Sequence, residues 1–234
     1  MNRSSALEPV TPRIVLLGAQ VEELVQRAAL ALLAGDLNEV AAVVAADEEV
    51  DRLAHAIERD VSAKLTVESG PADVAQLITA LRVVHEIERI GDLMVKVAKA
   101  RRRLYPYDLQ PRVRGLFEQM REQAVAQLRL AVEAFADLDT AKATAIVDLD
   151  DVMDDLQRDL FRTILAVESP DAATLRIAVE VALVGRYFER VGDHATNVGE
   201  RIRRLGAPDA GGSGAADGTA GSAAAVRQQA AGVG

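Results

Sequence analysis

The chain of 234 residues contains no cysteine and no tryptophan, and aromatic residues make up only 3% of it. Without cysteine there can be no disulfide, thiolate metal site or thiol nucleophile, and the composition suits a reducing compartment such as the cytosol. Few stretches alternate β-branched and polar residues in the way that a half-buried strand does. We therefore expect an all-α protein without covalent cross-links.

Long hydrophobic runs are also missing. The longest, such as residues 28–34, are far too short to cross a bilayer, and residues 1–10 lack the apolar core of a secretion signal. The net charge of −9 disfavours binding to nucleic acid or to an anionic membrane surface, but it permits cations and basic partner surfaces. The sequence predicts a cytoplasmic protein with no direct membrane span and no nucleic-acid partner.

What the sequence does contain is an internal repeat. Glu-Arg-Ile-Gly-Asp at residues 88–92 recurs as Glu-Arg-Val-Gly-Asp at residues 189–193, and each copy is preceded by two aspartates at four-residue spacing. These upstream pairs are Asp47 with Asp51, and Asp150 with Asp154. Self-similarity at a fixed period predicts one structural unit written twice.

Apolar residues at three- and four-residue spacing predict three helices in each half. The expected helices cover residues 11–34, 36–65, 71–103, 111–135, 140–166 and 171–204. Gly35 should end the first helix, and Asp36 with Glu39 resembles a capping box that opens the second. Pattern breaks at residues 67–71 and 167–170 separate the second helix of each half from the third.

Short connections between long helices favour antiparallel neighbours, so each half should be an up-down-up three-helix bundle. The halves could be related by a pseudo-twofold axis or by a pseudo-translation. The expected organisation is an N-terminal segment (residues 1–12), a first bundle (13–105), a second bundle (110–205) and a flexible Ala/Gly/Ser-rich tail (206–234).

Several of the repeated acids lie within the apolar stripes of their helices. Asp47, Asp150 and Glu88 each occupy a stripe position, so they should point toward a neighbouring helix. Taking a carboxylate out of water is unfavourable unless a cation or hydrogen-bond donors compensate for it. A second register, with Asp151 and Asp155, has the same spacing, but alignment with the first half favours Asp150 and Asp154.

Two kinds of partner for these acids stay open. One is arginine, since five arginines lie close by in the sequence: Arg52, Arg82, Arg89, Arg186 and Arg190. The other is a metal ion, because four carboxylates per half offer all-oxygen ligation that suits Mg²⁺, Mn²⁺, Ca²⁺ or iron. Gly91 and Gly192, inside their helices, indicate either close helix packing or room for an ion.

The duplicated motifs, the helix count and the length together resemble the PhoU family of phosphate-signalling regulators over about residues 10 to 205. The resemblance implies a cytoplasmic protein of two three-helix bundles that binds metal through its acidic motifs. The implied metal ligands are Asp47, Asp51, Glu88, Asp92, Asp150, Asp154, Glu189 and Asp193.

The resemblance also implies a role without catalysis. Such a protein would control phosphate uptake and the phosphate-starvation response negatively, as an adaptor between the ATPase of a phosphate ABC transporter and a sensor histidine kinase. A homodimer stays open. That role agrees with the absence from the sequence of a Gly-rich phosphate loop and of a nucleophile beside a base.

The alternative is a histidine phosphotransfer protein, or another helical-bundle signalling adaptor without metal, with His85 as the candidate phosphate carrier. A ferritin-like di-iron oxidase is excluded because it needs Glu-x-x-His motifs. The residues three positions before the three histidines are Arg52, Arg82 and Val191.

Overall fold

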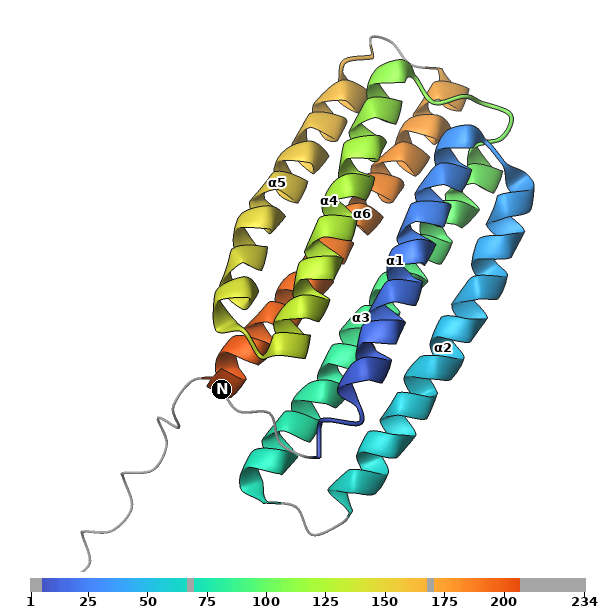
Figure 1. Ribbon diagram of the computed structural model, residues 1–234. Helices are drawn as coiled ribbons and strands as arrows, with labels where there is room; N and C mark the ends of the chain where they lie inside the picture. Colours follow the sequence, from blue (N-terminus) through green and yellow to red (C-terminus); the bar gives the residue numbers. More distant parts are fainter. Residues whose placement is uncertain (1–5, 67–69, 168–170, 207–234) are drawn as a thin grey trace, which may run out of the picture.

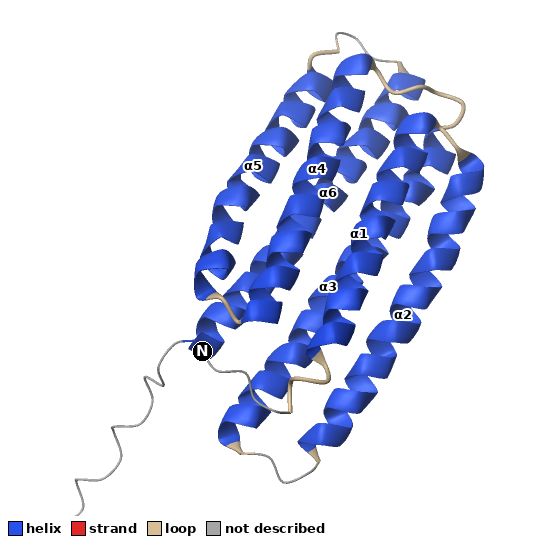
Figure 2. Cartoon of the chain, viewed as in Figure 1, coloured by secondary structure: helices blue, strands red, loops and turns tan. Residues whose placement is uncertain are grey.

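The computed structural model describes residues 6–66, 70–167 and 171–206, and all regular secondary structure in these ranges is helical (Figure 2). The six helices found there are α1 (Thr11–Ala34), α2 (Leu37–Leu65), α3 (Pro71–Leu104), α4 (Pro111–Asp137), α5 (Thr140–Leu165) and α6 (Ala172–Gly206). Each agrees with a predicted helix to within two residues at either end. The expected all-α fold is confirmed.

Short polar or glycine-containing turns end the first helix of each half and start the second. Gly35 ends α1 with φ of 76°, and Leu138 takes the corresponding left-handed place after α4 with φ of 51°. The Asp36 carboxylate accepts from the backbone N–H groups of Asn38 and Glu39, which is the expected N-cap. The prediction of a complete capping box was wrong, because the Glu39 side chain does not return to the start of the helix but pairs with Arg27 Nε at 2.6 Å.

Figure 1 shows the two three-helix bundles side by side, with α2 and α5 on opposite flanks. The bundles meet where α1 packs on α4 and α3 packs on α6. Corresponding helices of the two bundles run in opposite directions, so a pseudo-twofold axis and not a translation relates them.

One continuous core runs through both bundles. The predicted stripe of α1 is fully inside it, with Ile14, Leu17, Val21, Leu24 and Ala28 all at most 2% exposed. The described helices include none that is long and apolar enough to cross a membrane. The predicted breaks at residues 67–69 and 168–170, and the predicted tail at residues 207–234, lie outside the described residues.

Candidate functional site

The predicted acids of the first half gather between α2 and α3. Asp47 and Asp51 come from α2, Glu88 and Asp92 come from α3, and all four are partly buried; we call them the first acidic cluster. Burial, and then the charges of Asp51, Asp92 and Glu88, raise the pKa of Asp47 from 3.8 to about 6. The Asp47 Oδ1 atom is buried without a hydrogen-bond partner.

The second half repeats this arrangement between α5 and α6. Its second acidic cluster consists of Asp150 and Asp154 from α5 with Glu189 and Asp193 from α6. Burial and the charge of Asp193 raise the pKa of Glu189, which is only 9% exposed. Its Oε2 atom is also buried without a partner. The fold thus brings together four carboxylates in each half.

The aspartate register on α5 is the preferred one. Asp150 and Asp154 lie close enough to α6 for their charges to act on Asp193 and Glu189. Asp151 and Asp155, by contrast, are exposed. Asp155 pairs with Arg158 on its own helix at 2.6 Å.

The glycines of both motifs make room for the first aspartate of each α2 or α5 pair. A Cβ atom on Gly91 would lie 3.1 Å from Asp47 Oδ1, and one on Gly192 would lie 2.3 Å from Asp150 Oδ1. Either added carbon would press on the aspartate carboxylate. Close approach therefore explains why each motif contains glycine, as one of the two predicted reasons.

Basic side chains pair with part of each cluster. His85 Nδ1 lies 3.4 Å from Glu88, Arg186 pairs with Glu189, and both basic side chains are 54% exposed. Likewise, Arg89 NH1 lies 3.1 Å from Asp92. These contacts leave the buried oxygens Asp47 Oδ1 and Glu189 Oε2 unsatisfied, so the arginine explanation accounts for the outer part of each cluster only.

The donor set has the chemistry of a hard-cation site, since each cluster offers only oxygens, and one buried oxygen in each has no donor. In the part of the chain that the structure describes, however, no three His, Asp or Glu groups already surround one point as metal ligands. Glu88 and Glu189 are instead drawn to His85 and Arg186, three residues earlier on their own helices. The residues fit an ion, but their side chains are not closed around one.

A polar network that was not predicted from the sequence lies between the two bundles. The Glu86 carboxylate, 5% exposed, accepts from His194 Nδ1 at 2.8 Å, Arg201 NH2 at 3.0 Å and Asn197 Nδ2 at 3.3 Å. His194, which directly follows Asp193 on α6, belongs to this network. The sequence signal for a buried Glu86 is its place directly before Ile87 and two residues after Val84, both of which are buried.

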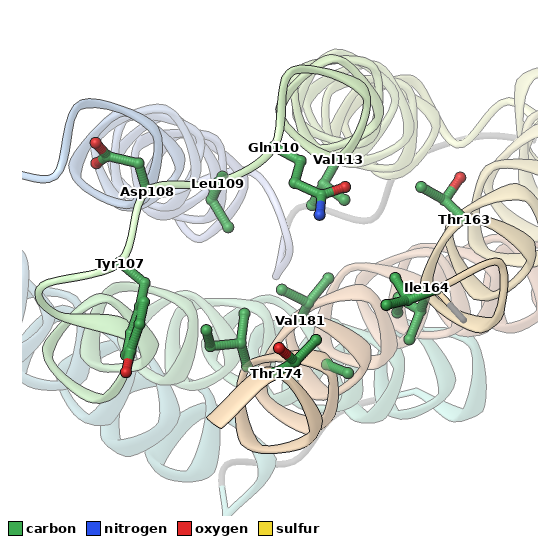
Figure 3. Close-up of a pocket in the computed structure, with 12 residues that line it drawn as sticks. Tyr107, Asp108, Leu109, Gln110, Val113, Thr163, Ile164, Thr174 and Val181 are labelled. Carbon is green, nitrogen blue, oxygen red and sulfur yellow. The ribbon is translucent and has the colours of Figure 1, made fainter. Parts of the chain in front are cut away.

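A separate pocket of about 170 Å³ lies where the α3–α4 connection meets the ends of α5 and α6 (Figure 3). Val113, Ile164 and Val181 point into it, whereas the Asp108 carboxylate points away. No member of either acidic cluster lines this pocket. It is therefore distinct from the sites that the repeat identifies.

Comparison with known proteins decides the family. The model of the PhoU domain matches twice, at residues 14–100 and 117–202, and these ranges include all eight clustered acids. The chain belongs to the PhoU family. PhoU-type proteins are regulatory accessory proteins and not enzymes, as the resemblance implied.

Individual relatives agree with this assignment. The chain is 34% identical over 179 residues to the phosphate-specific transport system accessory protein PhoU homolog 1 of Mycobacterium tuberculosis, covering 76% of this chain and 80% of the relative. It is 29% identical to the corresponding PhoU homolog of Synechocystis, covering 84% and 88%. The crystal structure of PhoU from Pseudomonas aeruginosa superposes with a TM-score of 0.79 at 25% identity, covering 86% of this chain and 97% of that one.

Proposed function

We propose that this PhoU-family chain is a cytoplasmic accessory protein of a phosphate-specific transport system, and that it controls phosphate uptake and the starvation response negatively. Its family and the names of its relatives support the link to phosphate transport. As an adaptor, it would contact the ATPase of the phosphate ABC transporter and a sensor histidine kinase. Its output would be the assembly of these partners and not a chemical reaction.

The proposal includes metal binding at the two acidic clusters. The main support is that each cluster brings four carboxylates together and leaves at least one buried carboxylate oxygen without a hydrogen-bond donor. A cation such as Mg²⁺, Mn²⁺, Ca²⁺ or iron would supply the missing positive charge. The proposed ligands are Asp47, Asp51, Glu88, Asp92, Asp150, Asp154, Glu189 and Asp193.

An ion in a cluster would also affect partner binding. Burial, and then the charges of neighbouring acids, raise the pKa values of Asp47 and Glu189. A cation would offset both effects, and so hold α2 against α3 and α5 against α6. An ion with open coordination positions could in addition accept a carboxylate or phosphate oxygen from a partner. Through either effect the two acidic clusters, and not the pocket of Figure 3, would be the regulatory part of the molecule.

A phosphate-starvation reporter tests the regulatory role. We expect a strain that lacks this protein to express the reporter at high phosphate, and the intact gene to silence it again. The double variant Asp150→Asn with Asp154→Asn should fail to restore silence. A reporter that stays silent in the deletion strain would count against negative control.

The same helix offers a matched control for the metal sites. Like the 150/154 variant, Asp151→Asn with Asp155→Asn removes two negative charges at four-residue spacing on α5. Its two residues, however, lie on the exposed face of that helix. Titration of chelator-stripped protein with Mn²⁺ should show one binding event lost in the 150/154 variant and none in the 151/155 variant. An equal loss of Mn²⁺ binding in both variants would show that the protein binds Mn²⁺ through its general surface charge and not through the acidic clusters.

A further inference from the structure

The two acidic clusters differ at one buried position beneath them. In the first half, Leu24 of α1 fills the space next to Gly91, with its Cδ2 atom 3.5 Å from where a Cβ on that glycine would lie. In the second half, Gln127 of α4 fills the matching space next to Gly192, with its Nε2 atom 3.0 Å from the corresponding point. An apolar side chain and an amide thus occupy equivalent places.

Gln127 contacts the second cluster directly. Its Nε2 atom donates to Asp150 Oδ1 at 3.1 Å, and the side chain is completely buried. Its Oε1 atom has no hydrogen-bond partner. The Thr196 hydroxyl of α6 lies near the same Asp150 carboxylate. An unpaired buried oxygen is unfavourable for the fold.

Packing alone does not require this amide. The first half fills the same place with leucine, which has no polar atom to satisfy. The glutamine is therefore best explained by what its amide does to Asp150. A hydrogen bond to a ligand carboxylate fixes its orientation, and loss of such a partner typically lowers metal affinity by about 10- to 100-fold.

We infer that Gln127 is a positioning residue that orients Asp150 and makes the second acidic cluster the tighter of two unequal ion sites. The inference rests on the proposed metal binding. Asp47, its counterpart, has an unpaired Oδ1 atom and leucine beneath it, so nothing comparable orients that carboxylate. The first cluster should fill only after the second.

The experiment is calorimetric titration of the chelator-stripped full chain with Mn²⁺. The intact chain should show two binding events of different affinity. In an Asp47→Asn, Asp51→Asn background, which leaves only the second cluster, Gln127→Leu should weaken the remaining event by about 10- to 100-fold. Leu24→Gln in an Asp150→Asn, Asp154→Asn background should strengthen the event at the first cluster.

Gln123 provides the matched control on the same helix. It lies one turn before Gln127, and its amide donates to the backbone carbonyl of Leu149 and not to a clustered acid. Gln123→Leu should leave Mn²⁺ affinity unchanged. Thermal unfolding of each metal-free variant shows whether it is folded, and Gln127→Met offers a closer match in shape should the leucine variant unfold.

The outcomes separate the two proposals. If the intact chain takes up no Mn²⁺, both the proposed metal function and this inference fail. If it binds Mn²⁺ but Gln127→Leu and Gln127→Met leave the affinity of the second cluster unchanged, the metal function stands and the positioning role is refuted. Equal weakening by Gln123→Leu would also refute it, because the effect would then belong to α4 as a whole.

Discussion

Glu86 and Glu88 lie two residues apart on α3 and belong to different kinds of surroundings. Burial acts to raise the pKa of both, and the charge of Asp92 raises that of Glu88 further. For Glu86, hydrogen bonds from His194, Arg201 and Asn197 outweigh burial, and its pKa is lowered. One carboxylate is satisfied by donors from the other bundle, whereas the other lies among like charges.

The contrast separates structure from candidate function. The acids of the clusters recur in both halves and are short of positive partners, which is unfavourable for the metal-free fold. The Glu86 network is not repeated, since Tyr187 occupies the matching place on α6, and it ties α3 to α6. The repeated acids therefore mark the ion sites that we propose, and the unrepeated acid holds the two bundles together.

The largest expected effect comes from removing the satisfied carboxylate. Glu86→Ala leaves His194 and Arg201 without their acceptor in a largely buried place, so we expect a loss of roughly 3 kcal/mol in the free energy of unfolding. Glu88→Ala in metal-free protein should change it by less than about 0.5 kcal/mol, or raise it, because repulsion is removed. Urea unfolding with a chelator present measures both, and similar losses would break the comparison.

The pH dependence of this difference has a definite sign. Because the pKa of Glu86 is lowered in the folded protein, its contribution is complete above the ordinary value of 4.5 and is lost as the pH falls through the lower folded value. The gap in stability between the intact chain and Glu86→Ala should therefore shrink as the pH falls below 4.5. A gap that widens below pH 4.5 would contradict this assignment.

The two glycines give a smaller contrast between the clusters. A Cβ at Gly192 would lie 2.3 Å from Asp150 Oδ1, which Gln127 holds, so Gly192→Ala must displace that carboxylate. We expect it to destabilise the fold by roughly 2 kcal/mol, the usual size of an overpacking effect. At Gly91 the contact is 3.1 Å and Asp47 Oδ1 is unpaired, so the helix propensity of alanine should offset most of the strain. Thermal unfolding of the two variants would show this order, or contradict it by equal shifts.

Whether a feature could be predicted from the sequence depends on how far apart in the chain the interacting residues lie. Helix ends were predictable because Gly35, Asp36 and Pro71 act locally through backbone conformation and capping. The acidic clusters were predictable because the repeat marks the same residues twice. The Glu86 network was not, because its partners lie more than 100 residues away on a helix that the pseudo-twofold arrangement brings alongside. The role of Gln127 was not predictable either, because its contact with Asp150, 23 residues later, depends on how α4 packs against α5.

The smallest expected effect concerns Asp47, whose raised pKa of about 6 means that folding disfavours its charged form. The unfavourable contribution is present in full above pH 6, and it disappears as the pH falls from there toward the ordinary value of 3.8. Allowing for solvent screening of a half-exposed group, Asp47→Asn should stabilise the metal-free protein by about 1 kcal/mol at pH 7.5 and have little effect at pH 4.5.

Saturating Mn²⁺ should reverse the effect of Asp47→Asn at pH 7.5, because an ion bound by the carboxylate stabilises only the intact chain. Asp51→Asn is the matched comparison, since Asp51 lies one turn further along α2 and both of these changes remove one charge. Its stabilising effect without metal should be smaller, because Asp47 provides the buried, unpaired oxygen. Chemical unfolding at the two pH values, with chelator and with Mn²⁺, measures all four combinations. A stabilisation by Asp47→Asn that is equal at both pH values would show that the buried charge of Asp47 is not its cause.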